Sequence, residues 1–302
     1  MTIDNRLWFL ALCVFWGGTW LAVKMTVTEA PPLLVACIRA IVSGIAMLAI
    51  AGPGAARELF VRAPSRVTQV ALLTTTLSFA AVFWGTARLS TGVSAIVNNA
   101  TVPIGLLVFG YLLREETVSG RQLLGIALGI VGLGLLFARR TGGRLDTSAI
   151  AGLVGVVVGA LAYCLGSVLA RPLLRTASPL SVGALQMLIG GIAMVPLVWL
   201  VERPTAVEVA ALLAPVPLLG IGWMVIAGGV GATFIYLRLI RDWGPTRAGM
   251  YAFVTPIIAT ALGVFVLHER LGAMEIVGAV VLLAAAALVI PHRPGTGDRR
   301  GT

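Results

Sequence analysis

The chain has 302 residues, of which 59% are hydrophobic and 11% charged, whereas soluble domains have about 45–50% and about 25%. A chain with so few charged residues has too little polar surface to cover a soluble core of this size. The composition therefore excludes an ordinary soluble domain and indicates one embedded in lipid. The formal net charge is +10, but the basic residues are scattered in ones and twos between apolar runs, which argues against a nucleic-acid partner.

Ten apolar runs, each typical of a membrane-spanning helix, follow one another along the chain and predict an all-α integral membrane protein. At about 20 residues per span, ten helices leave about a hundred residues for loops and no room for a soluble catalytic domain. The segment before the first run is short and weakly charged, so we expect a retained helix and not a cleaved signal peptide. We expect helices at about 7–27, 33–51, 67–87, 93–113, 123–138, 149–170, 180–201, 217–240, 247–267 and 273–290.

The last five runs repeat the first five. In the earlier part of each half, matching residues are separated by 147 residues along the chain, as are Trp16 and Tyr163. Later the separation is 153 residues, so six residues must be inserted, in the stretch around 202–217. The later separation relates Pro103, Gly110, Glu116 and Gly125 to Pro256, Gly263, Glu269 and Gly278.

Five is an odd number of spans, so the chain leaves the first repeat on the side of the membrane opposite to the one on which it began. The second repeat therefore starts from the opposite side. The two halves must then be inverted relative to each other, which is typical of alternating-access transporters. We therefore predict a first five-helix repeat at 1–145, a second, inverted one at 146–292 and a short basic tail at 293–302.

Lysine and arginine residues are shared unevenly between alternate loops. With the N-terminus inside, fourteen fall on the inner side, seven on the outer side and Arg39 within a helix. Because positive residues concentrate in cytoplasmic loops, we expect a multi-pass inner (plasma) membrane protein with both termini cytoplasmic. The outer trio Arg139, Arg140 and Arg144 runs against this rule.

Acidic residues are absent from the interiors of the predicted spans, since all twelve fall at or outside helix ends. Proton and sodium coupling usually require a carboxylate inside the bundle. The only lysine, Lys24, precedes Met25, so the chain lacks the GK[ST] part of a P-loop for ATP. We predict facilitated diffusion or exchange, with no metal or other cofactor.

Four polar residues within the predicted spans are candidate substrate ligands. Arg39 could anchor a substrate carboxylate, and the alternative is a structural arginine that snorkels or bonds to backbone. Its counterpart in the repeat is the neutral Gln186. Asn98 and Asn99 are adjacent and so point about 100° apart, which lets at most one of them face a cavity squarely.

Pro103 and Pro256 occupy matching positions in the two halves. A proline inside a helix removes one backbone hydrogen bond, which here frees the carbonyls of Asn99 and Ala252. We expect the two prolines to act as matched hinges.

Seven aromatic residues with polar tips, among them Trp84 and Trp223, lie deep in the predicted spans or near helices that would line a cavity. A lone aromatic in a span more often serves packing than ligand contact. Polar-tipped rings at repeat-related positions, such as Trp16 and Tyr163, nevertheless suit a planar or amphipathic solute. The substrate-binding candidates of this kind are Trp16, Trp20, Tyr163, Tyr236 and Tyr251.

The segment Phe-Trp-Gly-Gly-Thr-Trp at 15–20, followed by Lys24, resembles the first-helix signature of the EamA-type drug/metabolite transporters. The blocks 95–125 and 250–278 resemble the family blocks that end each half, with proline, glycine and glutamate in order. The resemblance implies a ten-helix exporter or exchanger of small metabolites, with helices one to four and six to nine around a central cavity. The second half departs from the tryptophan motif at 163–167.

These observations predict a secondary transporter of small metabolites, amino acids or related amphipathic compounds in the first place, and not an enzyme. Exchange of nucleotide-sugars or drugs is the alternative within the superfamily, although a nucleotide would require a basic cluster and only Arg39 is available. An intramembrane enzyme is a remote alternative, because no nucleophile–histidine constellation or GxSxG occurs. We expect a monomer or weak dimer whose partners are the bilayer and the small-molecule substrate.

Overall fold

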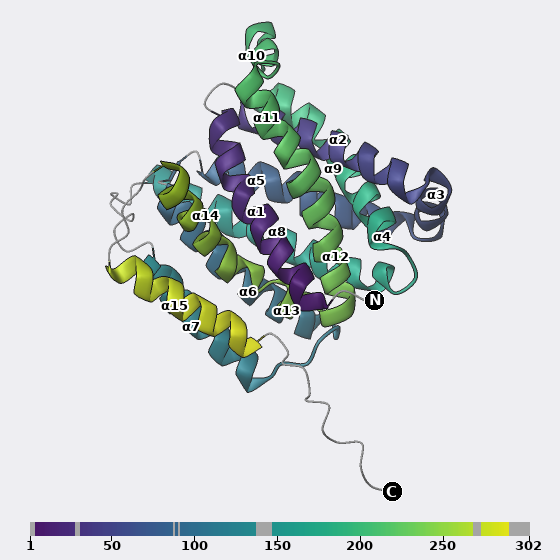
Figure 1. The fold of residues 1–302 in the computed structure, drawn as a ribbon. Coiled ribbons are helices and arrows are strands. Elements are labelled where there is room, and N and C mark those ends of the chain that lie inside the picture. The colour runs from purple at the N-terminus through teal and green to yellow at the C-terminus, as the bar shows by residue number, and fades with distance from the viewer. Residues whose placement is uncertain are drawn as a thin grey trace, which may run out of the picture.

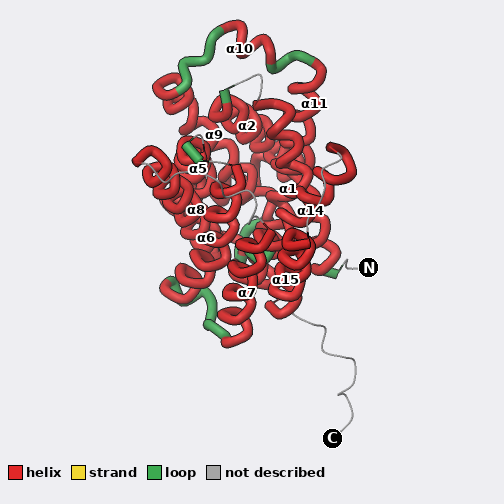
Figure 2. The backbone as a smooth tube through the Cα atoms, turned by 90° about the vertical axis from the view of Figure 1, so that its left-hand side faces the viewer, coloured by secondary structure: helices red, strands yellow, loops and turns green. Residues whose placement is uncertain are grey.

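The computed structural model describes residues 4–27, 31–86, 88–89, 91–136, 147–267 and 273–289. In these ranges the chain is helical throughout, with no strand, and short loops join the helices (Figure 2). The elements are α1 (Asn5–Val27), α2 (Pro32–Ala51), α3 (Pro53–Arg62), α4 (Pro64–Ala71), η1 (Leu72–Leu77), α5 (Ser78–Thr86), α6 (Thr91–Leu112), α7 (Gly120–Leu136), α8 (Thr147–Leu174), α9 (Pro179–Val201), α10 (Ala206–Ala211), α11 (Pro215–Trp223), η2 (Met224–Gly231), α12 (Ala232–Trp243), α13 (Pro245–Ala248), α14 (Tyr251–Leu267) and α15 (Ala273–Val289).

Each of the ten expected runs overlies a helix or a continuous series of helical segments. Six of the described helices are long and apolar enough to cross a bilayer, and the helices Gly120–Leu136 and Ile276–Val289 are apolar but shorter. The fold is therefore all-helical and of the integral-membrane kind, while ten crossings stay a prediction. The six long helices are Pro32–Ala51, Pro64–Thr86, Val93–Leu112, Thr147–Leu174, Pro179–Val201 and Pro215–Trp243.

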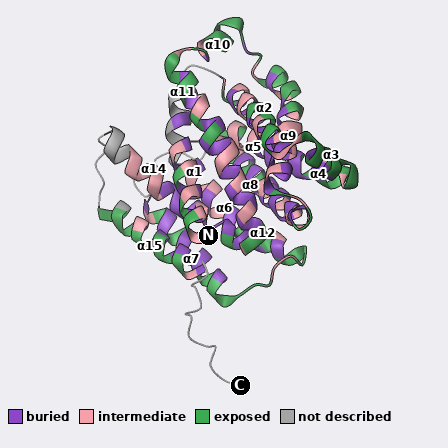
Figure 3. Ribbon diagram, turned by 45° about the vertical axis from the view of Figure 1, so that its right-hand side comes forward, coloured by how far each residue is buried: buried purple, intermediate pink, exposed green. Residues whose placement is uncertain are grey.

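The outer surface of the bundle is apolar. Figure 3 shows exposed residues on the outward faces of the helices and buried ones between them. Large apolar side chains such as Ile226 and Leu219 are 72% and 71% exposed. A surface of this kind suits lipid and not water.

Two helices were not expected from the sequence. The short helix α3 is exposed on most of its surface and carries Glu58 paired with Arg62, so this acidic residue lies within a helix but outside the predicted spans. Helix α10 falls within the predicted insertion at 202–217 and begins with a capping box, in which Thr205 and Glu208 bond to each other's backbone. The amide and hydroxyl of Thr205 donate to Glu208 and hold the pKa of that carboxyl below its usual value.

The third and eighth runs each contain a π-helical segment, η1 and η2, which the sequence did not predict. A π-helical turn takes an extra residue and is often found at functional sites. In η1, Thr75 and Thr76 donate hydrogen bonds to backbone carbonyls of α9. In η2, the carbonyl of Gly228 accepts a hydrogen bond from the indole N–H of Trp16 in α1.

Glycines set the closest helix pairs. A Cβ on Gly44 of α2 would lie 2.6 Å from the backbone nitrogen of Leu188 in α9, so the two helices touch backbone to backbone there. Gly132 of α7 and Gly278 of α15 meet in the same way. Helices α7 and α15 lie side by side at one edge of the bundle (Figures 1 and 2).

Candidate functional site

Four of the predicted aromatic residues meet inside the bundle, each from a different helix. Trp16 comes from α1, Tyr163 from α8, Tyr236 from α12 and Tyr251 from α14. The ring centroids of Trp16 lie 4.4 Å from Tyr251 and 5.2 Å from Tyr236. Those of Tyr236 lie 5.5 Å from Tyr251, edge to face, and 5.7 Å from Tyr163, stacked. These separations are those of attractive aromatic pairs, and we call the four residues the aromatic cluster.

Local sequence brings Trp16 into the cluster. The next residue, Gly17, has no side chain, and a Cβ there would lie 2.5 Å from Ile258, so α1 approaches α14 closely at this level. The indole N–H of Trp16 donates to the carbonyl oxygen of Gly228 at 3.2 Å. The π-helical segment η2 thus anchors Trp16 in its orientation.

The polar atoms of the cluster are only partly satisfied. The hydroxyl of Tyr236 lies near those of Tyr163 and Ser167, yet none of the three makes a hydrogen bond of normal geometry within the described residues. Buried polar groups without a partner cost free energy, of the order of 1–3 kcal/mol each. These hydroxyls are therefore suited to bond a polar group of a ligand.

Arg39 lies outside the aromatic cluster but within electrostatic range of the Tyr163 hydroxyl. Its guanidinium lies 4.7 Å from the ring centroid of Phe79, a cation–π contact, and its Nε is buried without a hydrogen bond. None of the carboxylates that the structure describes forms an ion pair with it. An unpaired guanidinium at this depth is costly, which makes Arg39 a candidate for pairing with an anionic group.

Gln186 lies on α9, the helix packed against α2, but at a different level from Arg39. Ile41 packs against Gly191 and Gly44 against Leu188, so Gln186 lies further along α2, toward Met47. Its side-chain Oε1 is buried and makes no hydrogen bond within the described chain. The structure does not bring Arg39 and Gln186 into contact.

Asn98 and Asn99 lie on α6, with Asn99 buried and Asn98 half-buried, as expected for adjacent helical residues. Pro103 and Pro256 are both buried inside continuous helices, α6 and α14. The side chain of Trp20 lies outside the described residues, as do Arg139, Arg140, Arg144, Glu269 and the tail 293–302.

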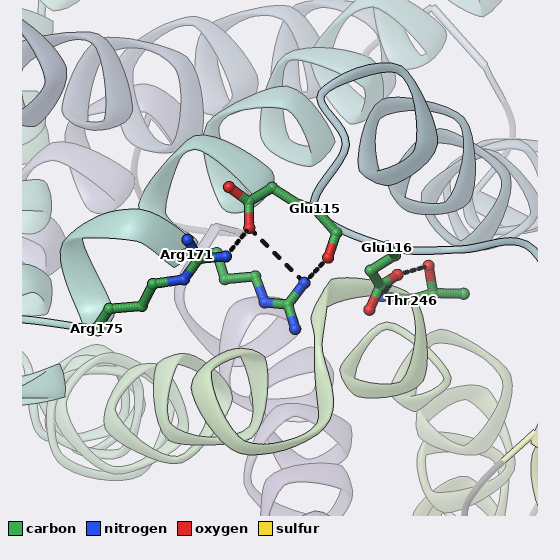
Figure 4. A network of polar contacts seen from close by, with 5 residues as sticks. All are labelled: Glu115, Glu116, Arg171, Arg175 and Thr246. Carbon is green, nitrogen blue, oxygen red and sulfur yellow. Dashed lines mark hydrogen bonds and ion pairs between the residues drawn. The ribbon is translucent and has the colours of Figure 1, made fainter.

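A polar network that the sequence did not predict lies at the end of the bundle where α1 begins (Figures 1 and 4). Arg175 pairs with the carboxylate of Glu115 at 2.6 Å, and Arg171 donates to the carbonyl of Glu115. Glu116 reaches a different element: its Oε2 accepts from the amide of Thr246 at 3.1 Å and from the Thr246 hydroxyl. In the sequence, Glu116 stands out only as the repeat counterpart of Glu269.

The carboxyl group of Glu116 is largely removed from water, and this burial raises its pKa. The two hydrogen bonds from Thr246 and the charges of Arg171 and Arg247 act in the opposite direction without cancelling the effect. Because the folded state then binds the proton more tightly than the unfolded chain, this group contributes less stability as the pH rises through its raised pKa.

The fold and the site define a multi-pass helical membrane protein with a polar-tipped aromatic core. The chain belongs to the EamA-like transporter family, whose model matches residues 6–138 and 150–290.

Among its relatives, the uncharacterized inner membrane transporter YedA of Escherichia coli (strain K12) is 28% identical over 291 residues, covering 94% of this chain and 92% of that one. Protein PecM of Dickeya dadantii (strain 3937) is 26% identical over 288 residues, covering 93% and 90%. A solved crystal structure matches with a TM-score of 0.76 and 18% identity, covering 94% of this chain and 95% of that one. At that identity the likeness concerns the fold alone.

Proposed function

We propose that the protein is an inner-membrane secondary transporter that moves small metabolites, amino acids or related amphipathic compounds, by alternating access. The observation that carries the proposal is the aromatic cluster with its unpartnered hydroxyls, which four different helices build inside the bundle. The family match and the printed names of relatives, inner membrane transporters among them, support the class and the membrane.

The packing of the helices supports two inverted five-helix repeats, 1–145 and 146–292, with ten spans and both termini cytoplasmic. Helix α2 packs on α9 and α7 on α15, so two pairs of corresponding runs touch each other. The contacts of α8 with α5 and α6 have counterparts in those of α1 with α12 and α14. When two halves are related by a two-fold axis, each contact has an equivalent in which the two halves are interchanged.

In this proposal the aromatic cluster and Trp20 contact the apolar body of the substrate from a central cavity. Arg39 pairs with its carboxylate, while Asn98, Asn99 and Gln186 supply amide groups to its polar end. The unpaired state of Arg39 and the free Oε1 of Gln186 support these roles.

The test is counterflow of labelled amino acids in proteoliposomes that contain the purified protein. Tyr236→Phe keeps the ring and removes one unpartnered hydroxyl, so a purely structural residue would leave transport and thermal stability unchanged. We expect counterflow to fall about tenfold, the equivalent of one lost hydrogen bond. The matched control is Tyr111→Phe, since Tyr111 is 61% exposed on α6.

Equal rates in Tyr236→Phe and Tyr111→Phe would remove the aromatic cluster from the substrate site, and counterflow of nucleotide-sugars alone would replace the substrate class. The absence of acidic residues inside the predicted spans supports exchange or facilitated diffusion. Uptake driven by an imposed pH gradient, with no substrate gradient, would contradict that mechanism.

The same assay tests Pro103 and Pro256 as hinges. Alanine at either position restores a backbone donor and stiffens the helix. We expect Pro103→Ala and Pro256→Ala to slow counterflow several-fold without lowering thermal stability. Pro196→Ala is the control, because Pro196 lies within α9 but is exposed. Unchanged rates in both hinge variants would remove the hinge proposal.

A further inference from the structure

The contact between Glu116 and Thr246 joins the two proposed halves. Glu116 lies in the connection between α6 and α7, and Thr246 lies in α13, separated from it by 130 residues along the chain. Its carboxylate accepts both the backbone N–H and the hydroxyl of Thr246. One side chain of the first half thus holds the start of a helix of the second half.

The turn before α13 is shaped to receive this carboxylate. Gly244 has a φ of +87°, a conformation that favours glycine, and a Cβ at this position would collide with Oε1 of Glu116. The next residue, Pro245, begins α13 and has no N–H of its own to satisfy. Glu116 therefore occupies a space that only the absence of a side chain at Gly244 leaves open.

The contact adjoins two of the helices that carry the aromatic cluster. Tyr251 begins α14 just after α13, and Tyr236 lies in α12 just before Gly244. Between them, Ala248 and Met250 are fully buried. The segment that Glu116 holds is thus the one that connects Tyr236 of α12 to Tyr251 of α14.

We propose that Glu116 is a positioning residue, a latch that keeps the α13–α14 segment closed over the aromatic cluster and whose release opens the site toward this end of the bundle. We define the Glu116 latch as the two bonds from Thr246 to its carboxylate. The inference rests on alternating access as proposed above, because only a transporter of that kind must open and close this end.

Cys164 offers a native reporter of this opening. It is fully buried and packs with Leu106 of α6 and Ala252 of α14. Movement of α14 would therefore uncover it. Cys37 is also buried but lies on α2, in a cluster with Leu33 of α2 and Met194 of α9, so it reports general loosening and not movement of α14.

The experiment measures the rate at which a membrane-impermeant maleimide labels Cys164 in the full-length protein, with Cys13 and Cys37 replaced by serine. We expect Glu116→Ala to raise the rate about tenfold. Glu116→Gln, which still accepts from Thr246, is expected to label no faster than the parent. The matched control is Glu58→Ala, since Glu58 pairs only with Arg62 on exposed α3.

A second protein, with Cys37 as the only cysteine, separates local opening from unfolding. We expect Glu116→Ala to leave its labelling unchanged. Equal acceleration at Cys37 and Cys164, or no acceleration at either, overturns the latch. Neither readout requires transport, so a protein that shows no counterflow but passes the labelling test contradicts the proposed function alone.

The latch is also expected to respond to pH. The groups that face Glu116 are Glu115 beside it, Arg171 and Arg175 from α8, Arg247 from α13 and Tyr236 from α12. Burial raises the pKa of the latched carboxyl, and opening would return it toward its ordinary value. The closed state then binds the proton more tightly, so the ratio of Cys164 labelling in the parent to that in Glu116→Gln should rise with pH. A flat ratio contradicts this dependence.

Discussion

Replacing Gly244 with alanine is expected to open the Glu116 latch and to destabilise the protein by about 4–9 kcal/mol. Alanine at the φ of +87° and ψ of 163° of Gly244 costs about 1–3 kcal/mol in backbone strain. Its Cβ would also displace the carboxylate of Glu116, and hydrogen bonds to a charged group contribute about 1.5–3 kcal/mol each. The measurements are the thermal unfolding midpoint in detergent and the labelling rate of Cys164.

Gly52→Ala is the matched control for this variant. Gly52 has a φ of +84°, and a Cβ there would meet nothing within 4 Å. It therefore carries the backbone strain without the collision. We expect Gly52→Ala to lower the unfolding midpoint by less than Gly244→Ala and to leave Cys164 buried. Equal effects of the two substitutions on both measurements would show that the Glu116 contact contributes nothing.

Replacing Gly44 with alanine is expected to separate α2 from α9. The new Cβ would lie 2.6 Å from the nitrogen and 2.8 Å from the Cα of Leu188, and backbone atoms cannot rotate away as a side chain can. Overpacking of this kind costs about 1–3 kcal/mol. Arg39 and Gln186 lie on these two helices, so we expect lower counterflow as well as a lower unfolding midpoint.

Gly134→Ala is the control for Gly44→Ala. Gly134 lies on α7, and a Cβ there would meet nothing within 4 Å. Alanine is favoured over glycine inside a helix by about 1 kcal/mol, so we expect Gly134→Ala to be neutral or stabilising. A similar loss of stability in both variants would mean that helix pairing at Gly44 is not limiting.

The positions of the helices could be predicted because an apolar run of about 20 residues is a strong local signal. Helices α3 and α10 were missed because they are short and lie between such runs. The segments η1 and η2 were missed for a different reason: a π-helical turn depends on which carbonyls find other partners, as Gly228 finds Trp16. No local pattern in the sequence indicates that choice.

For the site, the sequence identified residue types but not their neighbours. Trp16, Tyr163, Tyr236 and Tyr251 were selected as polar-tipped aromatics, and the structure brings all four together. The sequence relates Arg39 to Gln186 as repeat counterparts, and the structure places the two residues at different levels of α2 and α9. The contact of Glu116 with Thr246 was missed because it joins residues far apart in sequence through a turn at Gly244.

The exposed apolar surface determines what holds this bundle together. In water, the association of two apolar faces is favourable because it releases solvent from them. Lipid chains are as apolar as the side chains of these helices, so this contribution is absent in the bilayer. Association must then come from close atomic approach and from a few bonds shielded from water. The pair α7 and α15 touches the other helices chiefly through α6 and α14. Its cohesion therefore depends on the glycine seam between Gly132 and Gly278, and the surrounding lipid becomes in effect a component of the folded state.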